Sequence, residues 1–516
     1  MLVRRFLYLS FLISVTKTAR ILGVFPTPSI SHQVVFHPLM EELASRGHEV
    51  VVITADPAFP KGKTPPNLNE IDVHDLEYET ISEFFKIFSE HEDNLNSQNK
   101  IIFKFLTKLF EVLVESEQVQ NLIHDKNKKF DLIFTEACIR ATISFSYLYQ
   151  VPVIEFSSFS GYYGTFESIG AATHPVLYPN AMSRKFSNMT IWEKINELYY
   201  HYSALSMYND HVQYENEVLK RLFGSEIPDI NELRKNIRMV FLNIHPIWDF
   251  NRPVPPNVIY LGQMHLQKER VKKLPEEIEL FVNSSVHGFI YMSFGTNVKL
   301  SSLPQEKIQI FSKIFSEIPY EVLWKRDGEI PVSLSQNIKI SEWFPQSTLL
   351  RHPKIKLFIT QGGLQSTDEA IFAGVPLIVV PCLGDQWYNA EQYVRHGIGR
   401  KLELNNLNEK LLKESIEDVI HNKSYRENVK KLRQIITDQP QTSLEKAVWW
   451  TEYVLRHKGA KHLMTPAANL SWLEYYEINF VIFLLGILFL CIISIIFILR
   501  LLVTFLFVRD IKIKEN

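Results

Sequence analysis

The sequence predicts an α/β protein built in two halves, followed by a single membrane-spanning helix. Short apolar stretches alternate with amphipathic helical patterns in both halves, which is typical of parallel sheets covered on both faces. The chain has 516 residues, 46% hydrophobic and 22% charged, which is enough for two globular domains with separate cores. Residues 480–499 contain no charged side chain and have about the 20-residue length of a transmembrane helix.

Charge and cysteine content exclude several classes of protein. A formal net charge of −2 gives no basic surface for a polyanion, so we expect no nucleic-acid partner. The three cysteines, Cys138, Cys382 and Cys491, have no spacing typical of a disulfide framework or a zinc site.

Residues 1–19 have the pattern of a cleaved secretory signal peptide. Arg4 and Arg5 precede an apolar stretch at residues 6–15, and small residues at Thr18 and Ala19 suit a cleavage site. The alternative is a first buried strand with an irregular start.

The charges around the membrane helix predict its orientation. Glu474 and Glu477 precede it, whereas the basic side chains lie in residues 500–516. By the positive-inside rule this tail is cytoplasmic and the body lumenal, as in a single-pass type I protein. Lys512 and Lys514 resemble a dilysine signal for retrieval to the endoplasmic reticulum, although a merely basic tail is the alternative. Four glycosylation sequons are compatible with a lumenal body: Asn188, Asn283, Asn422 and Asn469.

The first α/β domain is predicted at residues 20–245. An apolar strand at 21–25, an amphipathic helix and a second strand at 50–53 form a βαβ unit. A later strand, "FDLIFTEA", ends at Glu136. Residues 155–180 are rich in aromatic residues and glycine, and a loop of that length is usually functional or mobile.

The second α/β domain is predicted at residues 286–455, after a proline-rich linker at 246–285. Its strands begin at "HGFIYMSFGTN" and continue to about Gly399. Residues 456–479 then form a membrane-proximal segment before the helix at 480–499.

The turn Gln361-Gly362-Gly363 is a candidate phosphate site. It lies between a predicted strand and helix, where ligands bind in parallel sheets and where free N–H groups favour an anion. A glycine turn without a phosphate explains these residues alone equally well. Glu369 could accept hydrogen bonds from ribose hydroxyls, and Asp385 with Gln386 could do so from a sugar, although each alone suits a cap or surface residue.

These motifs resemble the signature of the animal membrane-bound UDP-glucuronosyltransferase and UDP-glucosyltransferase family. The resemblance rests on "WFPQ" at residues 343–346, "FITQGG" at 358–363, Glu369 and the pair Asp385-Gln386, and it extends to "SFGTN" at 293–297. It implies two facing Rossmann-like domains of GT-B type, the first for the acceptor and the second for a UDP-sugar. It also implies no metal and no cofactor, since the UDP-sugar is a co-substrate, and it leaves homo- or hetero-oligomers possible.

The resemblance also implies roles for donor-site residues. Trp343 should stack on uracil, Gln346 should bind the edge of the base, and Glu369 should bind the ribose. Asp385 and Gln386 should bind the sugar hydroxyls. Relatives commonly have His at the position of Gln361, and a Gln there can donate to phosphate but cannot become positive. The residues expected around the phosphates are Ser293, Thr296, Gln361, Gly363, Gln365 and Ser366.

His32 is the candidate catalytic base. It begins a predicted helix, where the helix dipole disfavours the imidazolium and keeps a neutral base available. In the family the matching His deprotonates the acceptor hydroxyl, and a carboxylate orients it. The matching acid here is Glu136, where many relatives have Asp, so the reach of the carboxylate differs. We expect His37 and His48 to be structural.

The sequence therefore predicts an inverting transferase that moves glucose or glucuronate from a UDP-sugar to a hydroxyl of a small lipophilic acceptor. The alternative is a membrane-anchored protein of the same fold that binds nucleotide sugars without catalysis. Aromatic residues of the 155–180 loop suggest a flat, apolar acceptor, yet core packing explains most of them equally well.

Overall fold

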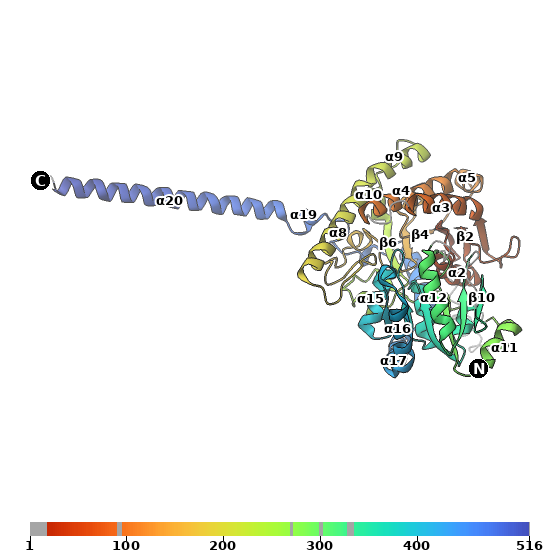
Figure 1. Ribbon diagram of the computed structural model, residues 1–516. Coiled ribbons are helices and arrows are strands. Elements are labelled where there is room, and N and C mark those ends of the chain that lie inside the picture. The colour runs from red at the N-terminus through yellow and green to blue at the C-terminus, as the bar shows by residue number, and fades with distance from the viewer. Residues whose placement is uncertain (1–17, 90–94, 269–271, 299–302, 328–334, 515–516) are drawn as a thin grey trace, which may run out of the picture.

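The structure is a computed structural model that describes residues 18–89, 95–268, 272–298, 303–327 and 335–514. It contains two parallel β-sheets, stacked in one body, and a long C-terminal helix that projects from that body (Figure 1). Both sheets are wholly parallel, as predicted. Of the predicted signal peptide, residues 1–17 lie outside the described residues.

The first sheet has seven strands in the order β3-β2-β1-β4-β5-β6-β7. The direction of the strand order reverses between β1 and β4. Ligands of parallel sheets bind at such a switch point. The strands are β1 (Arg20–Phe25), β2 (Glu49–Thr54), β3 (Leu68–Asp72), β4 (Leu132–Glu136), β5 (Val153–Ser157), β6 (Ile237–Leu242) and β7 (Val258–Tyr260).

Strand β1 shows why this sheet is covered on both faces. Successive side chains of a strand point to opposite faces. Leu22 and Val24 pack into one hydrophobic core, whereas Ile21 and Phe25 pack into the other, and all four are fully buried. A strand buried on both sides needs a continuous apolar run, which the sequence "RILGVF" supplies.

The second sheet has six strands in the order β10-β9-β8-β11-β12-β13. Its central strand β8 pairs with β9 on one side and β11 on the other, so the turns after these strands lie together. The strands are β8 (Phe289–Ser293), β9 (Glu321–Lys325), β10 (Ile338–Ser341), β11 (Ile355–Thr360), β12 (Leu377–Val379) and β13 (Gly399–Lys401).

Helices cover both sheets. Those of the first half are α2 (Ile30–Ser45), α3 (His74–Ser89), α4 (Leu95–Glu115), α5 (Glu117–His124), α6 (Phe145–Tyr149), α7 (Thr165–Ser168), α8 (Ile191–Asp210), α9 (Val212–Phe223) and α10 (Ile230–Leu233). Those that follow are α11 (Glu276–Ser284), α12 (Gln305–Glu317), α13 (Gln346–Leu350), α14 (Leu364–Ala373), α15 (Gln386–His396), α16 (Glu409–His421), α17 (Lys423–Thr437) and α18 (Ser443–Arg456). The chain continues with α19 (Trp472–Tyr475) and α20 (Ile478–Lys514), and α20 covers neither sheet.

Two elements cross the predicted domain boundaries. Strand β7 falls within the predicted linker, yet it pairs with β6 as the edge of the first sheet. Helix α18 falls within the predicted second domain, yet Ala447 and Val448 pack into the core that contains Phe25 of the first. The chain therefore returns to the first half before it reaches the membrane-proximal segment.

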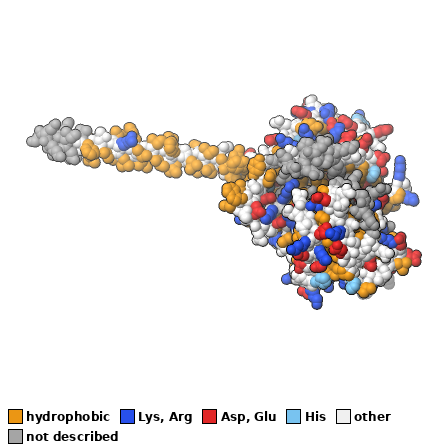
Figure 2. Space-filling view, viewed as in Figure 1, with side chains coloured by type: hydrophobic (Ala, Val, Ile, Leu, Met, Phe, Trp, Pro, Cys, Tyr) orange, Lys and Arg blue, Asp and Glu red, His pale blue; other side chains and the backbone are white. Residues whose placement is uncertain are grey.

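Helix α20 is longer than the predicted transmembrane segment. It includes residues 480–499 and also continues through most of the predicted tail to Lys514. Ile478–Phe507 is long and apolar enough to cross a membrane, and none of its most apolar stretch is buried in the protein. Apolar side chains cover this helix on the visible side (Figure 2).

Candidate active site

A cleft of about 750 Å³ lies between the two halves. Its walls come from turns at the carboxyl ends of strands in both sheets. Thr27 and Cys138 follow strands of the first sheet, whereas Ser293, Lys325 and Gln361 end or follow strands of the second. All eleven predicted donor-site residues line this cleft, and so does His32.

Two glycines of the second half let side chains pack directly against the backbone of its turns. Gly295 has φ +74°, and a Cβ there would collide with the side-chain amide of Gln361. Gly362 has φ +93°, and a Cβ there would lie 2.6 Å from Cγ2 of Val379. Helix α14 begins directly after Gly363, so its first N–H groups and the positive end of its dipole lie at the cleft. This geometry suits an anion such as a diphosphate.

Trp343, Gln346 and Glu369 lie on the same part of the cleft wall. Nε2 of Gln346 donates 3.0 Å hydrogen bonds to Oγ of Ser366 and to Oε2 of Glu369. The indole of Trp343 is 56% exposed, and Nζ of Lys325 lies 4.7 Å from its ring centre. The exposed part of the indole offers a flat apolar surface on which a planar base can stack.

Asp385 and Gln386 begin helix α15 at the cleft. Oδ2 of Asp385 accepts a 2.9 Å hydrogen bond from Asn389. Burial raises the pKa of Asp385 to about 6, and Asn389 and the nearby His32 partly offset that rise. Oε1 of Gln386 accepts two 2.8 Å bonds from the backbone N–H groups of Cys382 and Leu383, so the amide nitrogen is the group it can offer a ligand.

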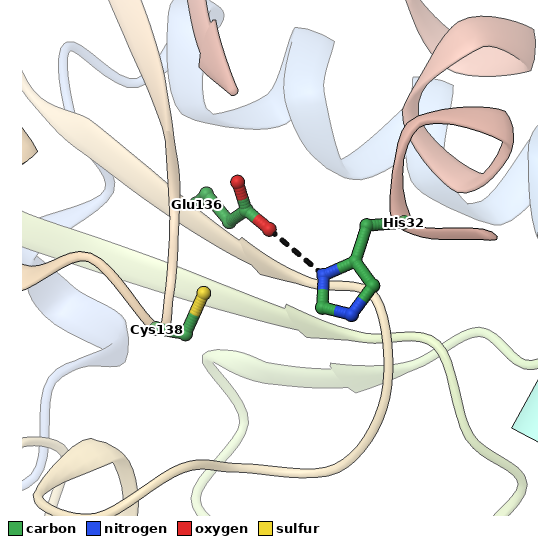
Figure 3. Close-up of side chains that lie close together, drawn as sticks. All are labelled: His32, Glu136 and Cys138. Atoms are coloured by element: carbon green, nitrogen blue, oxygen red, sulfur yellow. Dashed lines mark hydrogen bonds and ion pairs between the residues drawn. The ribbon is translucent and has the colours of Figure 1, made fainter. Parts of the chain in front are cut away.

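His32 and Glu136 form a hydrogen-bonded dyad on the opposite wall. Nδ1 of His32 lies 3.0 Å from Oε1 of Glu136, whose side chain is 1% exposed (Figure 3). The other carboxylate oxygen accepts a 3.1 Å hydrogen bond from the backbone N–H of Thr27. Both oxygens are thus fixed, and the longer Glu side chain still reaches the imidazole. When Nδ1 carries the proton that Glu136 accepts, Nε2 is left as a base.

Cys138 lies beside this dyad. Its Sγ, a carboxylate oxygen of Glu136 and a ring nitrogen of His32 lie within 4.8 Å of one another, which is close enough for a metal site (Figure 3). A cysteine binds metal as the thiolate. Burial, followed by the charge of Glu136, raises the pKa of the Cys138 thiol well above its usual value. The cluster therefore suits an acid–base dyad better than a metal ion.

His37 and His48, which were expected to be structural, each form a hydrogen bond with the backbone. Nε2 of His37 lies 2.9 Å from the backbone oxygen of Asp56, and burial lowers its pKa to about 4. Nδ1 of His48 accepts a hydrogen bond from the backbone N–H of Ala19.

The part of the cleft near His32 is lined by apolar side chains. Phe159 packs its ring 5.8 Å from that of His32, and Tyr162 lies next to Phe159. Other aromatic residues of the 155–180 loop, such as Tyr163 and Phe166, are buried in the core and do not line the cleft. Other apolar side chains that the first half contributes to the cleft include Ile30, Val34, Ile81, Phe84, Ile102, Phe105, Leu106 and Met182.

Side-chain hydrogen bonds join the two halves at the cleft. Asn297 donates a 2.9 Å hydrogen bond to Oγ of Ser29. Nε2 of Gln365 donates a 2.9 Å bond to the backbone oxygen of Ser158. Gln365 was expected at the phosphates, and in this structure its amide instead binds the wall that carries His32.

Ser158 and Lys325 are site residues that the sequence patterns missed. Oγ of Ser158 lies 3.0 Å from Nδ1 of His32, as a second partner for that nitrogen. Lys325 ends strand β9, and its Nζ donates a 2.8 Å bond to the backbone oxygen of Gly295. The rule that ligands bind at carboxyl ends of strands would have selected Lys325, whereas Ser158 had no signal beyond its place in the long loop.

Two parallel α/β halves around one cleft, with a His–Glu dyad opposite a glycine turn that leads into a helix, have the architecture of a glycosyltransferase of the GT-B type. The crystal structure of glycosyltransferase VinC in complex with DTDP has this fold, with a TM-score of 0.57 at 16% identity, covering 85% of this chain and 100% of VinC. Glycosyltransferase SnogD from Streptomyces nogalater has a TM-score of 0.54 at 14% identity, covering 85% of this chain and 100% of SnogD.

Residues 20–515 match the family described as "UDP-glucoronosyl and UDP-glucosyl transferase". The chain belongs to this family and is a UDP-glycosyltransferase. It is 38% identical to an ecdysteroid UDP-glucosyltransferase of Spodoptera littoralis nuclear polyhedrosis virus, over 89% of this chain and 92% of the relative. It is 34% identical to UDP-glucosyltransferase 2 of Dactylopius coccus, over 92% of each chain.

Proposed function

We propose that this UDP-glycosyltransferase moves glucose from UDP-glucose to a hydroxyl of a small lipophilic acceptor, with inversion at the anomeric carbon. The observation that carries the proposal is the position of His32, which is hydrogen-bonded to the buried Glu136 and lines the same cleft as all the predicted donor-site residues. A base next to an apolar acceptor region and opposite a nucleotide site has the arrangement that direct displacement requires.

In the proposed reaction, Nε2 of His32 takes the proton of the acceptor hydroxyl as that oxygen attacks the anomeric carbon. The bond from this carbon to the UDP oxygen breaks, and UDP leaves with the electron pair. Glu136 stabilises the imidazolium that forms, because its carboxylate lies 3.0 Å from Nδ1. The N-terminal turn of α14 stabilises the negative charge that develops on the leaving diphosphate.

The donor would extend along the second half. Uracil would stack on Trp343, and the ribose hydroxyls would bind Glu369, which Gln346 already orients. The sugar would lie beside Asp385 and Gln386, at the end of the cleft nearest His32. The remaining predicted contacts to the diphosphate are Ser293, Thr296, Gln361, Gly363, Gln365 and Ser366.

The polar groups at the sugar end favour glucose over glucuronate. Glucose offers hydroxyls, which suit the carboxyl of Asp385 and the amide nitrogen of Gln386. A glucuronate carboxylate would instead be placed near the carboxyl of Asp385, and like charges repel. The relatives named UDP-glucosyltransferases support the same choice.

The acceptor would be lipophilic because apolar side chains line the cleft on the His32 side. The viral relative is named for ecdysteroids, so a steroid alcohol is a suitable candidate alongside phenols. A purely binding protein of the same fold would need neither the buried Glu136 nor its hydrogen bond to His32.

We place the protein in the endoplasmic reticulum membrane, with α20 as a single-pass anchor, the catalytic body lumenal and the tail cytoplasmic. The apolar surface of α20 and the basic residues after position 499 support this placement. Protease added to sealed vesicles should remove only the tail, and digestion of the body would contradict the orientation. Unchanged retention of a Lys512→Ser/Lys514→Ser variant in the reticulum would contradict the retrieval signal.

The function is tested with membranes that contain the full chain. Radiolabelled UDP-glucose and UDP-glucuronate are compared as donors for a panel of phenols and steroid alcohols, and His32→Ala membranes serve as the matched control. We expect glucoside formation that depends on His32. Transfer from UDP-glucuronate alone would contradict the donor assignment, and UDP binding without transfer to any acceptor would favour the binding protein.

A further inference from the structure

One face of helix α8 exposes a stripe of large apolar and aromatic side chains to solvent. This α8 face consists of Ile191, Trp192, Ile195, Tyr199 and Tyr202, and Trp192 is 72% exposed. Their spacing of three and four residues places them on one side of the helix, opposite the side that buries Ala204 and Tyr208. Single exposed apolar residues are common, whereas a continuous stripe usually marks a contact surface.

The stripe borders an open hollow. Leu198 and Met207 join Tyr199 and Tyr202 in lining a depression of about 510 Å³ on the surface of α8. Its remaining lining residues are Ser203 and Ser206, so no charged side chain lines it. An uncharged hollow beside exposed rings suits a hydrocarbon chain.

The α8 face lies on the same side of the body as the membrane helix. A Cβ at Gly170 would lie 2.7 Å from Cγ2 of Thr465 and 2.8 Å from the carbonyl carbon of Ala467, so the membrane-proximal segment packs on the loop that leads to α8. Figure 1 shows α8 at the edge of the body nearest α19 and the start of α20. Apolar side chains gather where α20 leaves the body (Figure 2).

The segment before α20 exposes the same kinds of side chain. Trp472, Tyr475 and Tyr476 are each more than half exposed, within six residues of the first residue of α20. Trp and Tyr are favoured at the boundary between lipid headgroups and acyl chains, where an apolar ring and a polar group are both satisfied. An amphipathic helix with such residues lies in the plane of that boundary.

We propose that the α8 face is a membrane-docking surface, which inserts into the leaflet that α20 enters and holds the body against the bilayer. The proposal rests on the proposed membrane anchor and is independent of the sugar-transfer chemistry. Two contacts, one covalent through α20 and one through α8, restrict the tilt of the body. The mouth of the cleft is thereby kept at a fixed height above the lipid, from which lipophilic acceptors partition.

Photocrosslinking in proteoliposomes of the full chain and radiolabelled phosphatidylcholine tests this contact. The photoreactive residue p-benzoylphenylalanine replaces Ile195, Val286 or Phe489 in three separate proteins. Val286 is 89% exposed and lies two residues after α11, a helix that Figure 1 shows at the edge of the body away from α20, and Phe489 lies within α20. We expect at least about tenfold more lipid adduct at position 195 than at 286, with position 489 as the positive control.

Each alternative has a distinct outcome. Adducts at position 489 without adducts at 195 would overturn the docking surface. A crosslink from position 195 to a second copy of the chain would assign the face to a protein dimer and overturn it as well. Absence of lipid adducts at position 489 would overturn the membrane anchor, and the docking proposal with it, while leaving glucosyl transfer to be measured separately.

A second measurement uses substitution. A protease site is inserted between Glu477 and Ile478 of the full chain, and the release of the body from vesicles is measured after cleavage. Trp192→Ser/Ile195→Ser should increase the equilibrium ratio of released to bound body by about tenfold, because it removes two of the five large apolar side chains of the α8 face. The control variant, Leu280→Ser/Val286→Ser, removes exposed apolar side chains elsewhere and should be released like the wild type. Unchanged UDP affinity in both variants would show that the body is folded. Equal release from both variants would contradict the proposal.

Discussion

The side-chain amide of Gln365 donates a 2.9 Å hydrogen bond to the backbone oxygen of Ser158, across the cleft between the two halves. The hydroxyl of Ser158 lies 3.0 Å from Nδ1 of His32. A residue at the start of α14, where the diphosphate is expected, is therefore two contacts away from the proposed base. This link gives a structural route by which donor binding and the position of the base can influence each other.

We expect Gln365→Met to lower turnover more than it lowers UDP affinity. The substitution keeps the length of the side chain but removes one interdomain hydrogen bond, which is worth about 0.5–1.5 kcal/mol and hence about two- to tenfold in rate. Steady-state kinetics and calorimetry with UDP give the two quantities. An effect on UDP affinity alone would mean that Gln365 acts only on the phosphates.

Trp343→Ala should weaken UDP binding by about 1–3 kcal/mol, the usual value for stacking a base on an aromatic ring. Trp343→Phe is the matched control, because it keeps a ring at the same position and should lose less. Calorimetry with UDP and the full chain measures both. Unchanged UDP affinity in Trp343→Ala would remove uracil from this part of the cleft.

Asp385 predicts a pH dependence of donor use. Burial raises its pKa to about 6, so the carboxylate that accepts hydrogen bonds from sugar hydroxyls is lost as the pH falls through about 6. The KM for UDP-glucose should therefore rise below that pH, and Asp385→Asn should abolish this part of the dependence. A pH profile that is unchanged by Asp385→Asn would show that another group titrates.

Glu77 predicts a pH-dependent stability. Among the described residues neither of its carboxyl oxygens has a hydrogen-bond partner, and burial, with the charge of Glu136, raises its pKa to about 9. The folded state thus binds this proton more tightly than the unfolded state, and the contribution of Glu77 to stability falls as the pH rises towards 9. Glu77→Gln should raise Tm more at pH 8 than at pH 5. Glu83→Gln, at an exposed position of the same helix, is the control, and an equal gain at both pH values would contradict the account.

Much of this architecture could be predicted because the strands and turns of a parallel sheet have recognisable local sequence patterns. The run "RILGVF" predicts a strand buried on both faces, and the glycines at 362 and 363 predict a close turn before a helix. The packing of α18 on the first half could not be predicted from a local pattern, because the apolar face of this helix would suit the core of either half. The contact between Ser158 and His32 joins residues 126 positions apart through one hydroxyl, and local patterns carry no information about that contact.

For Glu136, too, one feature could be predicted from the sequence and another could not. Its place at the end of a strand followed from the sequence, whereas its reach to His32 depended on a side-chain conformation that only the structure supplies. Oε1 lies 3.0 Å from Nδ1, and Oε2 is held by the N–H of Thr27. In a double variant, His32→Ala with Glu136→Gln, the losses in turnover should be less than additive, since a carboxylate that only orients His32 has nothing to orient once the imidazole is gone. Additive losses would mean that Glu136 acts independently.

The most direct test of the central claim is the turnover of His32→Ala with matched phenol and aromatic amine acceptors. A hydroxyl must lose its proton as the new bond forms, whereas an amine attacks through a free lone pair. We predict that turnover on the phenol falls by about 10²- to 10⁴-fold, that turnover on the amine falls much less, and that UDP affinity is nearly unchanged, because the nucleotide contacts lie in the other half. Wild-type turnover on the phenol in His32→Ala would contradict the assignment of His32 as the base.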